Sequence, residues 1–275
     1  LCESTATPTL RELTIIEASS KGRGLEPAAG ELASAAWLSQ VRALRLVGLP
    51  VNDADLVALV TSARLAQLHT LQLESLATEV KLTRKGLVPA LAAPEFRRLR
   101  ELVLSNVSLK VPGARCFATA PHADLLERLT LQQCKLGNEG ARLVLESPAL
   151  PALTSLSLGY NMLGDGAPVC VGPALARTLR RLQLSLNGLD DAWVRAFVAA
   201  RPLALTHLEL RSNGLSIAGV RMLIEAGTLP PLESISVSAS KHGAQKWGHE
   251  LGSLVVDLGD FSGSMGRWRF DHFDA

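Results

Sequence analysis

The amino-acid sequence predicts an α/β solenoid of about nine repeats, with a parallel inner sheet and outer helices. Three observations lead to this fold class. A short apolar phrase recurs at near-constant spacing, helix-like segments follow most of its copies, and the composition is aliphatic. Hydrophobic residues make up 47% of the chain but aromatic residues only 4%. A core of Leu, Val and Ala suits a repetitive stack better than an ordinary globular interior.

The recurring phrase is an apolar residue, two variable residues, an apolar residue, one variable residue and a final apolar residue. Its copies are LRELTI from Leu10, VRALRL from Val41, LHTLQL from Leu68, LRELVL from Leu99, LERLTL from Leu126, LTSLSL from Leu153, LRRLQL from Leu179, LTHLEL from Leu205 and LESISV from Leu232. Their starts are separated by 31, 27, 31, 27, 27, 26, 26 and 27 residues. This regularity predicts one strand and one returning connection in each copy.

Alternation within the phrase predicts which side chains face inward and which face the solvent. In a strand, successive side chains point to opposite faces, so the leucines turn toward the helices. The residues two, four and six positions after each start then line the inner wall of the sheet. Nine strands spaced about 4.8 Å apart give a wall of about 40 Å, which could accommodate a protein domain or an extended peptide.

Helical spacing follows the eighth copy most clearly. Ser216 precedes IAGVRMLIEAG, in which Val220, Leu223 and Ile224 form one apolar stripe and Gly227 stands where a C-terminal cap would fall. The pattern predicts an amphipathic helix packed on the sheet.

Other copies carry the same kind of signal. Asn52 or Asp53 could cap DLVALVTSARL, and Asp190 or Asp191 could cap AWVRAFVAA, where Trp193 and Phe197 are four residues apart. The sixth copy differs, because DGAPVCVGPALA contains two prolines and two glycines. Its helix is expected to be broken or replaced by irregular chain.

The copies from the fifth to the eighth extend the phrase to LERLTLQQCKL, LTSLSLGYNML, LRRLQLSLNGL and LTHLELRSNGL. They place Cys134, Asn161, Asn187 and Asn213 at one shared position, where the chain leaves the strand. A buried amide there can satisfy main-chain groups that no ladder reaches, so we assign these asparagines a structural role. Cys134 takes the same position, which indicates a structural buried thiol.

This extended phrase resembles the leucine-rich repeat, LxxLxLxxN/CxL, and the repeat length resembles the ribonuclease-inhibitor type. Four early copies depart from it by carrying Ala18, Leu49, Leu76 and Val107 at the Asn position. The resemblance implies a horseshoe-shaped array that binds a protein partner through its concave face or its rims. Fold alone does not establish that function.

The candidate binding residues lie on or near the inner wall, in the fifth to the eighth copies. They are Arg128, Gln132, Tyr160, Arg181, Gln183, His207, Glu209 and Arg211. On the eighth copy, His207, Glu209 and Arg211 combine an imidazole, a carboxylate and a guanidinium group, which could be interpreted as a catalytic site. Alternating residues of a strand are about 7 Å apart, however, which is too far for direct proton relay. We therefore expect either a polar interface or a solvated surface.

No sequence motif for catalysis or for a cofactor is present. GxxxxGK[ST], GxSxG, HExxH and an EF-hand loop are all absent, and His242 with His249 would still need two further ligands for a metal. Lys plus Arg (28) nearly balances Asp plus Glu (26), which favours neither nucleic acid nor an anionic membrane as partner. The sequence thus predicts a protein that is not an enzyme, with no cofactor, no metal and no membrane span.

Domain organisation is predicted as a repeat array over residues 1–240 and a C-terminal cap of the same domain over residues 241–275. The cap is expected because the repeat rhythm stops while aromatic residues accumulate. These are Trp247, Phe261, Trp268, Phe270 and Phe273. An aromatic docking tail is the alternative interpretation of this C-terminal segment.

Two copies are longer than the rest. Their basic insertions, over residues 19–30 and 77–86, are expected to lie on one rim of the array. The chain begins with Leu1 and shows no leader, so we expect an excerpt of a longer, cytoplasmic protein.

The function predicted from these observations is an intracellular protein-interaction scaffold whose partner and oligomeric state stay open. Two alternatives remain. The first is regulation of an enzyme, such as a GTPase activator using Arg23 or Arg84 on a rim loop. The second is a purely structural accessory domain of a longer chain.

Overall fold

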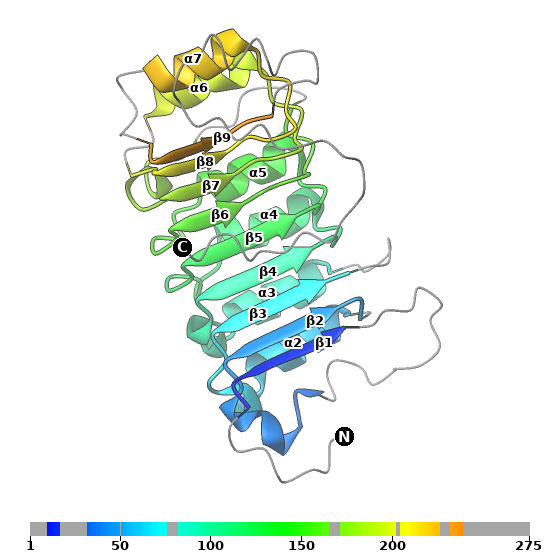
Figure 1. The fold of residues 1–275 in the computed structure, drawn as a ribbon. Coiled ribbons are helices and arrows are strands. Elements are labelled where there is room, and N and C mark those ends of the chain that lie inside the picture. The colour runs from blue at the N-terminus through cyan, green and yellow to red at the C-terminus, as the bar shows by residue number, and fades with distance from the viewer. Residues whose placement is uncertain are drawn as a thin grey trace.

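The computed structural model describes residues 10–16, 32–49, 51–75, 82–164, 171–201, 204–225 and 232–238. In this part of the chain, nine strands form a single sheet in which each strand pairs in parallel with the next (Figure 1). They are β1 (Glu12–Ile16), β2 (Ala43–Val47), β3 (Thr70–Glu74), β4 (Glu101–Ser105), β5 (Arg128–Gln132), β6 (Ser155–Ser157), β7 (Arg181–Gln183), β8 (His207–Glu209) and β9 (Ser234–Ser236). The predicted fold class and register are confirmed, because every strand begins two residues after the start of its copy.

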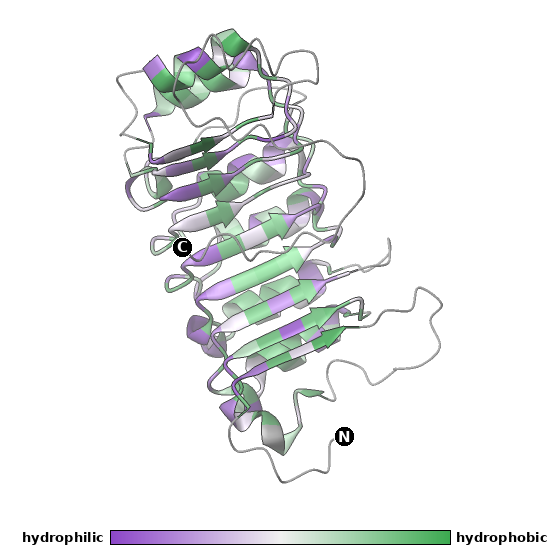
Figure 2. Cartoon of the chain, viewed as in Figure 1, coloured by the Kyte–Doolittle hydropathy of each residue, from purple (hydrophilic) through white to green (hydrophobic). Residues whose placement is uncertain are grey.

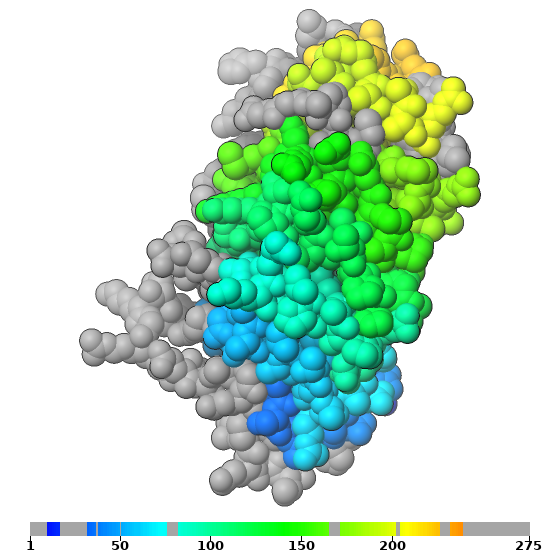
Figure 3. Space-filling model, turned by 180° about the vertical axis from the view of Figure 1, so that it is seen from behind, coloured from blue at the N-terminus to red at the C-terminus, as the bar shows by residue number. Residues whose placement is uncertain are grey.

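Helices pack behind the sheet and form the outer layer (Figures 1 and 3). The α-helices of the described residues are α2 (Asp53–Thr61), α3 (Arg84–Ala92), α4 (Lys110–Ala118), α5 (Gly137–Leu145), α6 (Asp191–Ala200) and α7 (Ile217–Glu225). Short 3-10 helices are η1 (Ala36–Gln40), η2 (Ala63–Leu65), η3 (Pro94–Arg98) and η4 (Leu175–Arg177). No described helix is long and apolar enough to cross a bilayer.

Side chains at the helix starts satisfy main-chain groups that the helix itself leaves unpaired. Asn52 caps α2 by accepting from the N–H groups of Ala54 and Asp55, and the Asp55 carboxylate accepts in return from the Asn52 N–H. Asp190 caps α6 by accepting from the N–H groups of Ala192 and Trp193. The predicted extent of the α2 segment is wrong, because the helix ends at Thr61, where Ser62 turns to an extended conformation.

The leucines between strands and helices form one continuous core. Leu44, Leu71 and Leu102, which are aligned on consecutive strands, are each at most 2% exposed. On the helix side, the rings of Trp193 and Phe197 stack with their centroids 4.7 Å apart and are buried. This confirms that the two aromatic residues pack in the core.

Two features of the helix layer bear on the sequence predictions. Ile224, assigned above to the buried stripe of α7, is 37% exposed, so that assignment is wrong; Val220 and Leu223 alone of the three are buried. In the sixth copy, residues 171–178 contain only the 3-10 helix η4. Gly172 packs there so closely on the end of α5 that a Cβ atom would lie 2.7 Å from Glu146 Cα.

Candidate interaction surface on the inner wall

The inner wall brings the sequence-predicted residues of β5 to β8 into two aligned rows. Arg128, Ser155, Arg181 and His207 pair in register along the first row. The second row consists of Thr130, Ser157, Gln183 and Glu209. Gln132 lies at the end of β5, and Arg211 follows β8. Hydrophilic residues gather toward the N-terminal ends of several strands (Figure 2).

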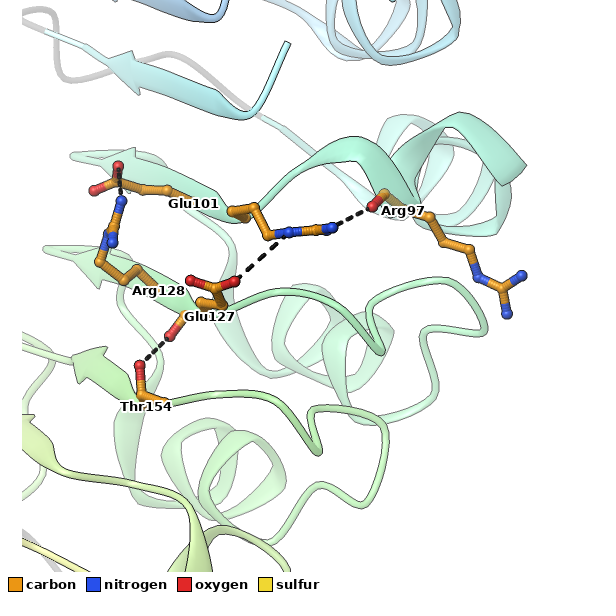
Figure 4. A network of polar contacts seen from close by, with 6 residues as sticks. Arg97, Glu101, Glu127, Arg128 and Thr154 are labelled. Atoms are coloured by element: carbon orange, nitrogen blue, oxygen red, sulfur yellow. Dashed lines mark hydrogen bonds and ion pairs between the residues drawn. The ribbon is translucent and has the colours of Figure 1, made fainter. Parts of the chain in front are cut away.

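At one end of the first row, Glu101 on β4 contacts Arg128 on β5 (Figure 4). Its Oε2 lies 3.2 Å from Nη2 of Arg128 and accepts a hydrogen bond of 3.1 Å from Thr70 Oγ1. The Arg128 side chain keeps 51% of its surface exposed. Glu101 was not among the predicted site residues, although opposite charges at the same position of adjacent copies indicate such a pair.

Serine hydroxyl groups orient two polar side chains of the second row. Ser157 Oγ donates to Gln183 Oε1 at 2.8 Å, and Ser185 Oγ donates to Glu209 Oε1 at 2.8 Å. Both serines are buried. The amide of Gln183 and the carboxylate of Glu209 are therefore held in place before any partner arrives, which lowers the entropy that binding would cost.

His207 lies between a hydroxyl group and a carboxylate. Its Nδ1 is 2.7 Å from Thr206 Oγ1, and its Nε2 is 4.0 Å from Glu233 Oε2. The Thr206 hydroxyl also donates to the main-chain oxygen of Arg180 at 3.2 Å, as Thr154 does to Glu127 two repeats earlier. Which of the hydroxyl and Nδ1 donates depends on the imidazole tautomer. The bond from the threonine hydroxyl to the main chain recurs in two repeats, so we assign Thr206 a structural role.

The two remaining candidate arginines, on β7 and after β8, also have partners. Arg181 and Arg211 are half-buried, and each interacts with another group of the chain. Within the described ranges, no group of three or more His, Cys, Asp or Glu side chains could hold a metal ion. The wall can therefore offer oriented donors and acceptors to a partner.

Tyr160 and Met162 lie on the loop that leaves β6, at the rim of the wall. Tyr160 is 49% exposed and Met162 67% exposed. Both have left-handed main-chain conformations, with φ of 59° and 62°. Gly159, which precedes Tyr160, is buried beside Gln132 and contributes no side chain to the surface next to Tyr160. Met162 was not among the predicted binding residues, because a methionine at this position of the sequence cannot be told from a core residue. Only the exposure of its side chain and its left-handed main chain, both seen in the structure, distinguish it.

The asparagines form a ladder beneath the same loops. Asn161 Nδ2 donates to the main-chain oxygens of Leu131, Leu158 and Gly159, and its Oδ1 accepts from the N–H of Cys134 at 2.9 Å.

The ladder continues through the following repeats. The Asn161 N–H donates to Asn187 Oδ1 at 2.7 Å, and the Asn187 N–H donates to Asn213 Oδ1 at 3.0 Å. Asn161 and Asn187 are buried and Asn213 is half-buried. Each amide therefore joins its own turn to the preceding repeat.

Cys134 occupies the position before this ladder and is completely buried. Its thiol donates to the main-chain oxygens of Leu104 and Gln132, each at 3.3 Å. Burial disfavours the thiolate and raises the pKa of Cys134 to about 12, against the lesser opposing effect of the Val107 N–H. The thiol therefore stays protonated at neutral pH and makes structural contacts.

Arg84, one of the two residues named for a GTPase-activating alternative, begins α3 and lies near the Cys116 thiol on α4. Burial raises the pKa of Cys116, and Arg84 partly opposes this effect. Arg23, Gly227, the C-terminal segment 241–275, His242 and His249 lie outside the described residues, as do the insertion at residues 19–30 and most of that at 77–86.

Known proteins with sequence or structural similarity to this chain include leucine-rich-repeat proteins. A family model described as a leucine-rich repeat matches residues 176–196. The ribonuclease inhibitor of the pig, Sus scrofa, is 32% identical over 204 residues, which are 71% of this chain and 43% of that protein. The match thus spans less than half the length of that relative. A chain in the crystal structure of the Rad7 and Elc1 complex in yeast is 17% identical, with a TM-score of 0.39, over 68% of this chain and 67% of that chain.

Proposed function

Because the chain is a leucine-rich-repeat protein of the ribonuclease-inhibitor type, we propose that it is a scaffold that binds a protein partner. The contact surface of this proposal is the inner wall from β5 to β8, together with the rim loop that carries Tyr160 and Met162. The pig relative is named for the inhibition of a ribonuclease, which is itself a protein. That name supports a protein as the class of partner here.

The observation that carries the proposal is the state of Tyr160 and Met162. A left-handed conformation costs a non-glycine residue about 1 kcal/mol, and both side chains remain largely exposed. The same left-handed turn recurs at Gln133, Lys135 and Leu186 in the neighbouring repeats, so the conformation belongs to the repeat and does not itself mark a site. Tyr160 and Met162 differ in that they present two large, exposed apolar side chains from one turn, and exposed apolar patches are typical of contact sites.

The neighbouring wall supplies the polar part of the surface. Glu209 and Gln183 are oriented by buried serines, and Arg128 offers an exposed guanidinium. Aromatic and arginine side chains dominate the energy of protein interfaces. Since Tyr160 is the one tyrosine in the chain, the proposal assigns it the central apolar contact and assigns Arg128 an outer polar one.

The test is site-specific photo-crosslinking followed by measurement of affinity. A photoreactive phenylalanine at Tyr160 should trap a partner in cells, and the same probe at Leu125, which is 41% exposed in a different loop, should not. The affinity of the purified partner should then fall about tenfold or more for Tyr160→Ala/Met162→Ala. Leu125→Ala serves as the matched control. Equal affinity of both variants, with unchanged melting temperatures, would refute the proposal.

A further inference from the structure

Three arginines and one histidine lie at the opposite end of the array, directly before β1, β2 and β3 and on β2 itself. Arg11, Arg42 and His69 occupy the same position in three consecutive copies, one residue before the inward-facing row. Their main chains are neighbours, since the Arg42 N–H donates to Arg11 O at 2.7 Å and the His69 N–H donates to Arg42 O at 2.8 Å. Arg45 faces inward from the middle of β2. We call these four residues the basic strip.

All four side chains of the basic strip are exposed. The ion pairs and side-chain hydrogen bonds of the described residues involve none of them. Arg100 occupies the same position in the fourth copy, so it continues the column formed by Arg11, Arg42 and His69. Its Nε lies 3.6 Å from Glu127 Oε1, and its Nη1 donates to Arg97 O (Figure 4). Within the described residues, Arg100 is thus paired with the next member of this column, whereas Arg11, Arg42 and His69 take part in no ion pair.

Nearby carboxylates do not change this imbalance. Glu12 lies beside Ala43 in the first inward row, and Glu74 accepts from Gln72 Nε2 at 3.5 Å. Neither is within ion-pair distance of a strip residue in the described part of the chain. Strands are about 4.8 Å apart, so neighbouring guanidinium groups repel one another unless an anion lies between them.

We infer that the basic strip docks an acidic, extended polypeptide segment of a partner protein. Arginine clusters recognise carboxylates through paired N–H donors, which Arg11, Arg42 and Arg45 can supply without breaking any described contact. The strip is separate from the surface around Tyr160, so the inference goes beyond the proposed function. The inference also specifies a negative charge for the partner segment, which the nearly neutral net charge of the whole chain does not indicate.

An apolar contact accompanies the strip and favours a polypeptide over a nucleic acid. Ile16, at the far end of β1, is 58% exposed and pairs in register with half-buried Val47. An extended segment lying along these strands would place carboxylates on the arginines and one aliphatic side chain on Ile16. Single-stranded nucleic acids instead stack on aromatic side chains, and the inward-facing residues of β1 to β3 include none.

The experiment uses fluorescence anisotropy with a short glutamate-rich peptide that carries one central leucine. The peptide should bind the full chain, and its dissociation constant should rise with ionic strength. Arg42→Glu/Arg45→Glu should weaken binding by about tenfold or more. Arg177→Glu/Arg195→Glu makes the same charge change at exposed positions away from the strip and should retain binding. Arg42→Gln/Arg45→Gln provides a milder second pair if the charge reversal fails to fold.

Three results would overturn the inference. The first is equal weakening by both charge-reversal pairs, which would indicate net charge alone. The second is equal binding of the peptide with glutamine in place of glutamate. The third is tighter binding of a single-stranded RNA of equal charge that the strip variant abolishes. Loss of peptide binding in the strip variant, with Tyr160→Ala/Met162→Ala unaffected, separates this inference from the proposed function.

Discussion

Asp191, the first residue of α6, accepts two hydrogen bonds from Ser216, which precedes α7 in the next repeat. Its Oδ1 receives the Ser216 N–H at 2.9 Å, and its Oδ2 receives the Ser216 hydroxyl. The same contact joins Asp53 of α2 to Thr83 before α3, where the N–H distance is 2.7 Å. In both places a carboxylate at one helix start binds the first residue of the next repeat's helix segment, near the positive ends of both helix dipoles.

Removing this contact should loosen the junction between two helices. We expect Asp191→Ala to lower the free energy of unfolding by about 1 to 2 kcal/mol, because it leaves the Ser216 N–H without its acceptor. Amide exchange in α7 should accelerate in the same variant. Asp53→Ala should instead accelerate exchange in α3. Uniform acceleration throughout the chain in either variant would contradict a local role.

Gly219 should tolerate no side chain while Asp191 is present. A Cβ atom there would lie 2.1 Å from Asp191 Oδ1. We expect Gly219→Ala to cost about 1 to 3 kcal/mol of stability. Urea unfolding of the single variants and of Asp191→Ala/Gly219→Ala measures the coupling. The double variant should be more stable than the sum of the single losses implies, and strict additivity would refute the clash.

Asn187→Ala should be among the more destabilising changes in the described part of the chain. It removes donors to the buried oxygens of Leu158 and Leu184 and the acceptor for the Asn161 N–H. We expect a loss of about 2 to 4 kcal/mol, measured by urea unfolding. Asn213→Ala removes equivalent bonds at a half-buried position, where water can replace them. Its loss should be smaller, and the reverse order would contradict the burial argument.

Cys134 should resist alkylation in the folded protein. With its pKa raised to about 12, the thiol stays protonated at pH 8, and mass spectrometry after iodoacetamide treatment should find it unmodified. The thiol of the unfolded chain has a pKa near 9.0, so the fold holds this proton more tightly. Its contribution to stability is therefore complete below pH 9 and declines as the pH rises toward 12. Cys134→Ala should lack that decline, and rapid native alkylation at pH 8 would contradict the burial effect.

Gln133→Gly should stabilise the protein. Gln133 is exposed and has φ of 55°, a conformation that glycine adopts without steric cost. We expect a gain of about 0.5 to 1 kcal/mol, seen as a higher melting temperature. Tyr160→Gly, at the equivalent position of the next repeat, should also gain stability but should lose partner binding. A destabilised Gln133→Gly variant would show that the local strain argument is wrong.

The strand register could be predicted from the sequence because it depends on a local pattern. Each LxxLxL phrase repeats within one strand, and a shift by one residue would expose every leucine. Asn161, Asn187 and Asn213 could be placed for the same reason. The N-cap residues Asn52, Asp190 and Ser216 are equally local signals.

Contacts between repeats could not be predicted in this way. Asp191 and Ser216 are 25 residues apart, and no single-repeat pattern joins them. The left-handed conformation of Tyr160 is also hidden, since tyrosine is not a typical residue for it. Val103, which faces the inner wall beside Gln72 and Thr130, is 5% exposed because its neighbours close over it. Its burial depends on their side-chain lengths.

The asparagine ladder gives the array a direction. The main-chain N–H of Asn161 donates to the side-chain Oδ1 of Asn187, and the N–H of Asn187 donates to Oδ1 of Asn213, so these turns are completed by the repeat that follows them in the chain. A chain emerging from the ribosome would leave each newly folded turn one bond short until the next repeat had formed. Synthesis from the amino end therefore completes the ladder one repeat at a time.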